Sequence, residues 1–305
     1  MNPPTYVHEE PTICDMSDNH AEIVARNRVS WNAAVPAHNS HRKGAAAFLR
    51  AGGSTLFPEE SSLLGHVRGL RIAHLLCGAG HDSISLASLG AIVNGVDVSD
   101  EAIDSALSLA DDCRSSAKFQ RSDVFEWLNK AGEVEAYDIV FASYGVICWL
   151  DDISRFMHAV GRILRPNGLF VLVDFHPVAM MYDRCLKREY PYSTSGNPIL
   201  VDKGVGDYVA KSGDALVPWG YQPGTTDFAN PHPCLAFRWG FMDLLTAVQG
   251  AGLHVRDNDF AEYGYSNGFR MFDCLEFDKP HRRWRLPISL PSMPMMFSIR
   301  AKRSP

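Results

Sequence analysis

The sequence predicts an α/β fold of the doubly wound kind, with a mostly parallel central sheet. Three observations support this prediction: strand-like and helix-like segments alternate between residues 70 and 176, a glycine-rich turn follows the first strand, and a carboxylate ends the second. Such alternation is typical of parallel strands joined by crossover helices. Strands are expected at 71–76, 92–97, 118–121, 139–143 and 169–175, and helices at 82–89, 100–111, 124–130 and 151–164.

The segment before this core is expected to be helical. Residues 1–20 are rich in Pro, Asp and Glu, which predicts a disordered tail. Residues 21–69 are expected to form a lid, with one helix that stops at Gly52 and another that opens at Pro58. A helical lid would lie across the core.

The segment after the core is expected to cover and complete it. Residues 177–237 are rich in Gly, Pro and Tyr with little periodicity, and so long an irregular segment predicts an inserted cover over a substrate site. Residues 238–305 are expected to complete the sheet, with a helix at 240–250 and strands at 254–260 and 295–300.

The composition is that of a globular chain with one large domain, since 46% of the 305 residues are hydrophobic and 21% are charged. The formal net charge of -6 argues against a nucleic-acid partner, because binding to phosphate backbones depends on clustered Lys and Arg. One short basic cluster, Arg282, Arg283 and Arg285, is interpreted as a solvated loop rather than a phosphate contact.

The cysteines and the apolar segments indicate the cellular location that we expect for the protein. The seven cysteines are scattered and show no Cys-x-x-Cys pair, which is typical of reduced thiols in a cytoplasmic protein. The N-terminus lacks a basic start followed by an apolar run, and no apolar stretch reaches the roughly 20 residues needed to cross a bilayer. We therefore expect no membrane association.

The strongest local signal is the turn formed by Gly78, Ala79 and Gly80, which joins a strand to a helix. Glycine allows a tight turn and a close approach of the backbone to a ligand at the helix N-terminus, where free N–H groups attract anions. The dinucleotide fingerprint requires a third glycine or an alanine where Ser83 stands, which disfavours a nicotinamide or flavin enzyme.

Further motifs follow the next strands. Asp97 ends the second strand, where a carboxylate can accept hydrogen bonds from ribose hydroxyls, although a nicotinamide enzyme would show the same acid. Asp123 and Val124 follow the third strand, and a Leu-Arg-Pro-Asn-Gly turn at 164–168 precedes the fifth. Each acid alone is equally well explained as a helix cap, so the argument depends on their occurrence together.

With these motifs, residues 70–177 resemble the class I S-adenosylmethionine-dependent methyltransferases. The resemblance implies a seven-stranded sheet, with S-adenosylmethionine as cofactor and S-adenosylhomocysteine as product. In the 164–168 turn Asn167 replaces a family glycine, which is tolerable because Asn accepts left-handed backbone angles. By this resemblance, the glycine turn would hold the methionine part of the cofactor. The acid after the second strand would hold the ribose, and the pair after the third strand would meet the adenine. The expected cofactor-binding residues are Gly78, Ala79, Gly80, Asp97, Val98, Asp123, Val124 and Ser143.

Candidates for acceptor chemistry lie near the same sheet edge and in the covering segments. His176 follows the fifth strand and titrates near neutrality, so it is a candidate base, although a hydrogen-bonded strand-end histidine is an equal interpretation. Tyr208 is a second catalytic candidate. The expected substrate or lid residues are Trp31, His38, His41, Tyr144, Trp149 and Tyr265, and no metal is expected because no third ligand accompanies the two histidines.

The sequence thus predicts methyl transfer from S-adenosylmethionine to an oxygen, nitrogen or sulfur of a small acceptor, aromatic and of secondary-metabolite type. The partner would be this small molecule, without nucleic acid or membrane, and the protein would be a monomer or homodimer. Two alternatives stay open: a nicotinamide-dependent oxidoreductase, and a protein that binds S-adenosylmethionine without turnover.

Overall fold

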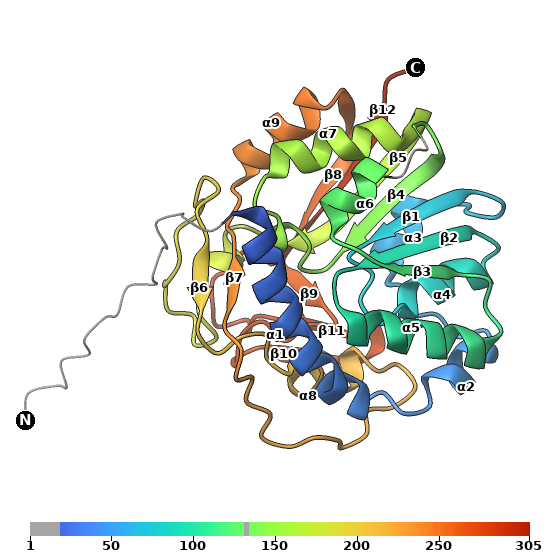
Figure 1. Ribbon diagram of the computed structural model, residues 1–305. Helices are drawn as coiled ribbons and strands as arrows, with labels where there is room; N and C mark the ends of the chain where they lie inside the picture. Colours follow the sequence, from blue (N-terminus) through green and yellow to red (C-terminus); the bar gives the residue numbers. More distant parts are fainter. Residues whose placement is uncertain (1–18, 131–133) are drawn as a thin grey trace, which may run out of the picture.

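A seven-stranded sheet forms the centre of the molecule (Figure 1), in a computed structural model that describes residues 19–130 and 134–305. The strand order is β3-β2-β1-β4-β5-β12-β8. The first five strands pair in parallel, and β12 runs antiparallel to both β5 and β8. The strands are β1 (Arg71–Leu75), β2 (Ile92–Asp97), β3 (Lys118–Arg121), β4 (Tyr137–Ser143), β5 (Leu164–Phe175), β8 (Leu253–Tyr263) and β12 (Met296–Arg303). The predicted fold class is confirmed.

Helices cover both faces of this sheet because successive strand residues point to opposite sides. In β4, Ile139 and Phe141 belong to one hydrophobic cluster, whereas Val140 and Ala142 belong to another. The first cluster includes side chains of α3, α4 and α5, and the second includes side chains of α6, α7 and α9. These helices are α3 (Pro58–Leu64), α4 (His81–Ser88), α5 (Asp100–Cys113), α6 (Val124–Lys130), α7 (Ile153–Ile163) and α9 (Phe241–Gly250).

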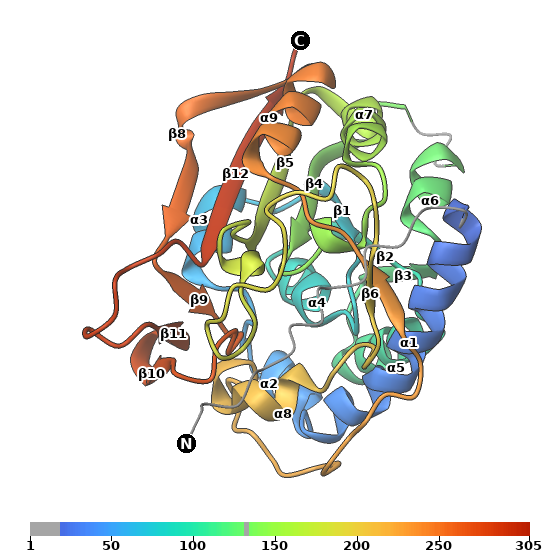
Figure 2. The same ribbon diagram turned by 90° about the vertical axis from the view of Figure 1, so that its left-hand side faces the viewer.

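The single helix predicted up to Gly52 is two helices, α1 (His20–Ser40) and α2 (Ala45–Arg50). Helix α1 ends at Ser40, and Gly44, at the N-cap of α2, has a φ of 92° that is outside helix geometry. Asn19 and Glu22 form a capping box at the start of α1. Figure 2 shows α1 along the side of the molecule, where it packs against α5 and against β7 (Cys234–Ala236).

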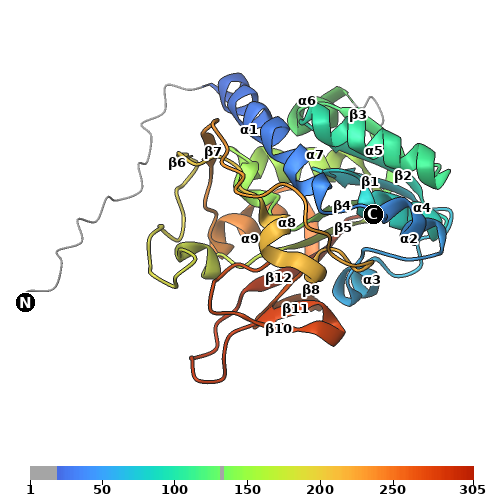
Figure 3. The same ribbon diagram turned by 90° about the horizontal axis from the view of Figure 1, so that it is seen from below.

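Two small sheets lie outside the seven strands, and the sequence patterns did not predict them. One pairs β6 (Ile199–Val201) with β7, and the other joins β9 (Tyr265–Asn267), β11 (Arg283–Arg285) and β10 (Glu276–Asp278). Figure 3 shows the second sheet on the same side of the molecule as α8 (Tyr208–Ser212). Short 3₁₀ helices lie at Ile147–Trp149, Ala179–Met181, Gly213–Ala215 and Lys279–His281.

The second small sheet corrects the interpretation of the basic cluster as a solvated loop. Arg283 is the first residue of the middle strand, its side chain is 13% exposed, and it contacts Glu59 at 3.6 Å and the Tyr265 ring at 4.1 Å. Arg282 lines a cavity. Pairing of β11 on both edges buries Arg283, whereas the Arg285 side chain stays 50% exposed, as the sequence interpretation expected.

No helix within 19–130 or 134–305 combines the length and apolarity needed to span a membrane.

Candidate active site

One cavity of about 220 Å³ lies where the parallel strands β1, β2, β3 and β4 end. Its floor consists of residues that directly follow these strands or end them: Leu76, Cys77, Gly78, Ala79, Asp97, Val98, Ser122, Asp123, Val124, Ser143, Tyr144 and Gly145. Its walls come from distant segments, namely α1, the 53–57 segment, α8 and the C-terminal region: Asn27, Trp31, His38, Arg42, Thr55, Phe57, Tyr208, Leu216, Phe269 and Arg282.

The glycine turn shapes the floor in two ways. A Cβ atom on Gly80 would come within 2.8 Å of Phe119 and Ala106, so Gly80 is required for packing, and it does not line the cavity. A Cβ atom on Gly78 would meet nothing within 4 Å, so open space lies beside this residue. The φ angle is positive in both residues, 53° in Gly78 and 78° in Gly80. The turn therefore combines a packed side and an open side.

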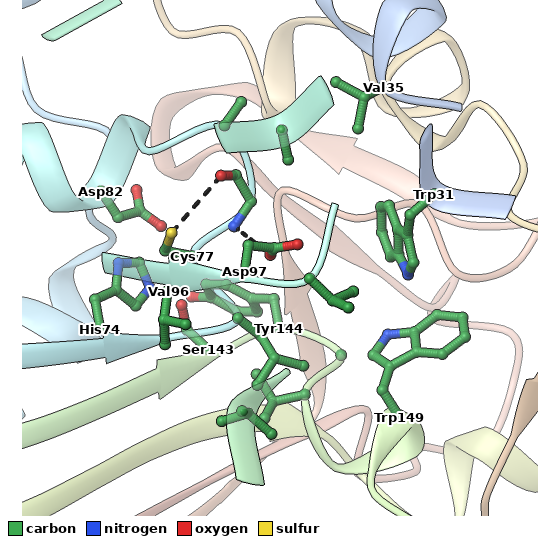
Figure 4. Close-up of a pocket in the computed structure, with 18 of the residues that line it drawn as sticks. Trp31, Val35, His74, Cys77, Asp82, Val96, Asp97, Ser143, Tyr144 and Trp149 are labelled. Carbon is green, nitrogen blue, oxygen red and sulfur yellow. Dashed lines mark hydrogen bonds between the residues drawn. The ribbon is translucent and has the colours of Figure 1, made fainter. Parts of the chain in front are cut away.

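Asp97 lies in the middle of the cavity (Figure 4) and is held by backbone groups. Its two carboxylate oxygens accept hydrogen bonds from the N–H groups of Gly78 and Ser99, both at 2.9 Å. Burial raises the pKa of Asp97, while these hydrogen bonds act in the opposite direction. Each oxygen keeps a second lone pair, so Asp97 can accept further hydrogen bonds from a ligand.

Asp123 caps α6 and also contacts α1. Its Oδ1 accepts from the N–H of Glu126 at 2.9 Å and lies 3.2 Å from Nε2 of His20, whose Nδ1 lies 2.7 Å from Asp151. Hydrogen bonds to Asp123 and Asp151 raise the pKa of His20 to about 9. Burial alone would raise the pKa of Asp123, but the hydrogen bond from His20 and that from Glu126 lower it overall. An imidazolium therefore bridges two carboxylates at this end of the cavity.

Aromatic rings in contact with one another form a further wall of the cavity. Trp31 lies 5.5 Å from Trp149 and 6.3 Å from Tyr208 between ring centroids. Phe269 lies 5.2 Å from Tyr208 and 5.7 Å from Tyr144. Figure 4 shows the two tryptophans side by side, with Asp97 and Tyr144 between them and Asp82. Such rings suit a flat or apolar ligand.

The two lid histidines differ in position. His38 lines the cavity, its Nε2 donates to the carbonyl of Gly206 at 2.9 Å, and burial lowers its pKa to about 4. His41 does not line the cavity, since its Nε2 contacts Asp207 at 2.9 Å and its Nδ1 donates to the carbonyl of Gln222. His41 thus fixes the covering segment at the start of α8. Within the described part of the chain, no group of three or more His, Cys, Asp or Glu side chains is arranged for a metal ion.

The structure does not place His176 in this cavity, which corrects its interpretation as a base. Its Nε2 donates to Glu262 at 2.8 Å, and its Nδ1 accepts from the N–H of Val178 at 3.1 Å. The ring is 2% exposed and packs against Phe241 and Phe297, because it points to the α9 side of the sheet. Both ring nitrogens are occupied, so neither is available to an acceptor.

Tyr265 also lies outside the cavity. Its hydroxyl donates to Glu59 at 2.6 Å.

Several residues that line the cavity were not predicted from the sequence, because their segments carry no motif. They are His20, Asn27, Arg42, Thr55, Phe57, Leu216, Phe269 and Arg282. Asp82 had a detectable signal, since it lies two residues after the glycine turn.

Comparison with known proteins identifies a methyltransferase domain within this fold. Residues 74–170 match a family model described as a methyltransferase domain. Over 116 residues the chain is 33% identical to a ubiquinone biosynthesis O-methyltransferase of Azorhizobium caulinodans, covering 38% of this chain and 44% of that protein. Over 109 residues it is 34% identical to YqeM of Bacillus subtilis, which is also named as a methyltransferase, covering 35% and 42%. The chain therefore spans less than half the length of these curated relatives.

Solved structures show the same fold. An S-adenosylmethionine-dependent methyltransferase from Mesorhizobium loti superposes with a TM-score of 0.52 at 20% identity, covering 82% of this chain and 99% of that one. Residues 74–170 therefore form a methyltransferase domain, and the fold is that of class I S-adenosylmethionine-dependent methyltransferases. This domain and this fold support S-adenosylmethionine as the cofactor.

Proposed function

We propose that this protein transfers a methyl group from S-adenosylmethionine to an oxygen, nitrogen or sulfur atom of a small aromatic acceptor. One observation carries the proposal: a single cavity joins the Asp97 and glycine-turn floor to the aromatic wall. Donor and acceptor can therefore meet in one enclosed space, which is what methyl transfer requires. The oxygen atom is favoured by the O-methyltransferase among the relatives.

The floor residues fit the cofactor. The open space beside Gly78 admits a ligand close to the backbone, and the spare lone pairs of Asp97 suit ribose hydroxyls. We propose that Gly78 and Ala79 contact the methionine part of the cofactor and that Asp97 and Val98 contact its ribose. Ser143 would contact the cofactor at the centre of the floor. Asp123 and Val124 would contact the adenine, with the His20 imidazolium beside them. Bound S-adenosylmethionine supplies a methyl group already activated by its sulfonium.

The wall residues fit an acceptor, and they include a group able to take its proton. Trp31, Tyr144 and Trp149 offer ring faces, while burial raises the pKa of Tyr208 and keeps its phenol neutral. His38 has its Nε2–H bound to a carbonyl, so Nδ1 carries a lone pair. We therefore replace His176 with His38 as the proposed base. The α1 helix would act as the lid that excludes water.

Methyl transfer is tested by incubating the protein with methyl-labelled S-adenosylmethionine and a metabolite extract, followed by mass spectrometry for labelled products. We expect at least one small labelled product, lost in Asp97→Ala. A lack of product over a broad acceptor panel, despite cofactor binding, would support a binding protein instead. Saturable fluorescence transfer from added NADH would support an oxidoreductase.

The acceptor so identified then tests the base. His38→Asn should lower kcat by roughly a hundredfold with little change in S-adenosylhomocysteine affinity. Tyr208→Phe is the matched control at the neighbouring ring, 4.1 Å away, and should change KM more than kcat. Near-parental kcat in His38→Asn would remove His38 from the reaction.

A further inference from the structure

Three residues from distant parts of the chain meet at one end of the cavity. They are Thr55 before α3, Asp82 in the first turn of α4, and Arg282 at the turn before β11. The Thr55 hydroxyl donates to Oδ1 of Asp82, and the Thr55 carbonyl accepts from Nη2 of Arg282 at 3.3 Å. One threonine therefore holds an anionic and a cationic side chain beside each other in the cavity wall.

Neither charged side chain forms a direct ion pair in the described part of the chain. In the segments 19–130 and 134–305, Oδ2 of Asp82 and Nη1 and Nε of Arg282 have no hydrogen-bond partner. The guanidinium lies over the Phe57 ring at 4.3 Å. Burial lowers the pKa of Arg282, and nearby Asp82 acts to raise it, so the two charges are close without touching. Unpaired charges in a cavity are costly unless a ligand supplies their partners.

The place of this pair in the fold indicates which ligand. Asp82 follows the glycine turn within two residues, and the open side of that turn is where a ligand approaches the backbone. Arg42, the other arginine that lines the cavity, lies close enough to Tyr208 on the aromatic wall to interact with it electrostatically. Asp97 and Asp123 already have backbone and His20 partners. A dipolar ligand group at Asp82 and Arg282 would satisfy both charges at once.

We propose that Asp82 and Arg282 bind the amino-acid end of S-adenosylmethionine, with Asp82 accepting from the α-ammonium and Arg282 donating to the α-carboxylate. This inference rests on the proposed function of the cavity as a cofactor site. Arg282 lies far outside the 74–170 methyltransferase match. The C-terminal small sheet is therefore part of the cofactor site, and the protein selects against cofactor fragments that lack the amino-acid end.

The test compares two ligands that differ in this end, S-adenosylhomocysteine and 5′-methylthioadenosine, by calorimetry on the full chain. Arg282→Met and Asp82→Asn should each lower the affinity for S-adenosylhomocysteine by about tenfold or more. The affinity for 5′-methylthioadenosine should stay within about twofold of the parental value. Arg42→Met is the matched control, and its ratio of the two affinities should stay at the parental value. Thermal melting confirms that each variant is folded.

A ligand-side measurement on the parent protein keeps the proposal testable if a variant does not fold. The carboxyl methyl ester of S-adenosylhomocysteine should bind about tenfold more weakly than the free acid. Four outcomes would each overturn this inference and leave the proposed function standing. In Arg282→Met, these are an equal loss of affinity for both ligands or an unchanged affinity for S-adenosylhomocysteine. The others are a selective loss of S-adenosylhomocysteine affinity in Arg42→Met alone, and full affinity of the parent protein for the ester. Failure of the parent to bind S-adenosylhomocysteine would overturn the proposed function, and this inference with it.

Discussion

The carboxylate of Asp97 accepts a hydrogen bond from the backbone N–H of Gly78 at 2.9 Å, and so connects the end of β2 to the glycine turn after β1. The same carboxylate lines the cavity. One side chain therefore shapes the turn and presents acceptors to a ligand, which joins two motifs that the sequence shows separately.

Asp97→Ala is expected to lower the affinity for both S-adenosylmethionine and S-adenosylhomocysteine by about tenfold or more. The reason is that a hydrogen-bond acceptor for the ribose is lost and the glycine turn loses a partner. Calorimetry measures the affinities. Asp97→Asn is the control, because it retains one carbonyl oxygen and should lose less. A folded Asp97→Ala variant with parental affinity would show that the ribose lies elsewhere.

His20 should make the stability of the fold depend on pH. Its folded pKa of about 9 exceeds the ordinary value of 6.5, so its stabilising contribution is complete below pH 6.5 and is lost as pH rises through about 9. The free energy of unfolding of the parent should therefore exceed that of His20→Gln by roughly 1 to 3 kcal/mol at pH 6, and by much less at pH 10. Urea titrations at several pH values measure this difference, and the exposed His66→Gln variant is the control. A difference that does not vary with pH would contradict the bridge to Asp123 and Asp151.

Asn27 connects α1 to β7 through two buried hydrogen bonds. Its side chain donates to the carbonyl of Leu235 at 2.9 Å and accepts from the N–H of Leu235 at 2.7 Å. Asn27→Ala leaves both backbone groups without a partner, so we expect a loss of about 2 to 4 kcal/mol in the free energy of unfolding. Urea denaturation measures the loss. Asn39→Ala removes one part-buried bond to Ser105 and should lose less than half as much, and equal losses would argue against this role of Asn27.

His176→Asn should lower stability without changing affinity for S-adenosylhomocysteine, because its ring contacts Glu262 and the α9 side of the sheet rather than the cavity. The expected loss is about 1 to 3 kcal/mol, from a buried group left without its partner. Denaturation and calorimetry on the same sample separate the two effects. Glu262→Gln should also lower the free energy of unfolding, but by less, since the Glu262 side chain is 49% exposed. Loss of affinity in His176→Asn with full stability would return His176 to the site.

The sequence alone determined the core of the fold and the floor of the cavity. The strands predicted at 92–97 and 118–121 and the helix predicted at 124–130 coincide with β2, β3 and α6. Asn167 adopts a φ of 66°, as the turn at 164–168 predicts. These features depend on residues close together in the chain, whose periodicity and turn chemistry act locally. Parallel strands then bring their carboxyl ends to one edge, which places Gly78, Asp97 and Asp123 together.

Only the tertiary structure decided which side chains surround that floor. His176 follows β5 as predicted, yet pairing of β5 with β12 and packing of α9 turn its ring away from the cavity. His20 and Arg282 carry no local motif, but the docking of α1 and the small C-terminal sheet brings both into the cavity wall. Contacts between segments two hundred residues apart, such as that of Thr55 with Arg282, depend on how whole elements pack. No pattern within one segment records the position of its neighbour, so the wall of the site is a property of packing.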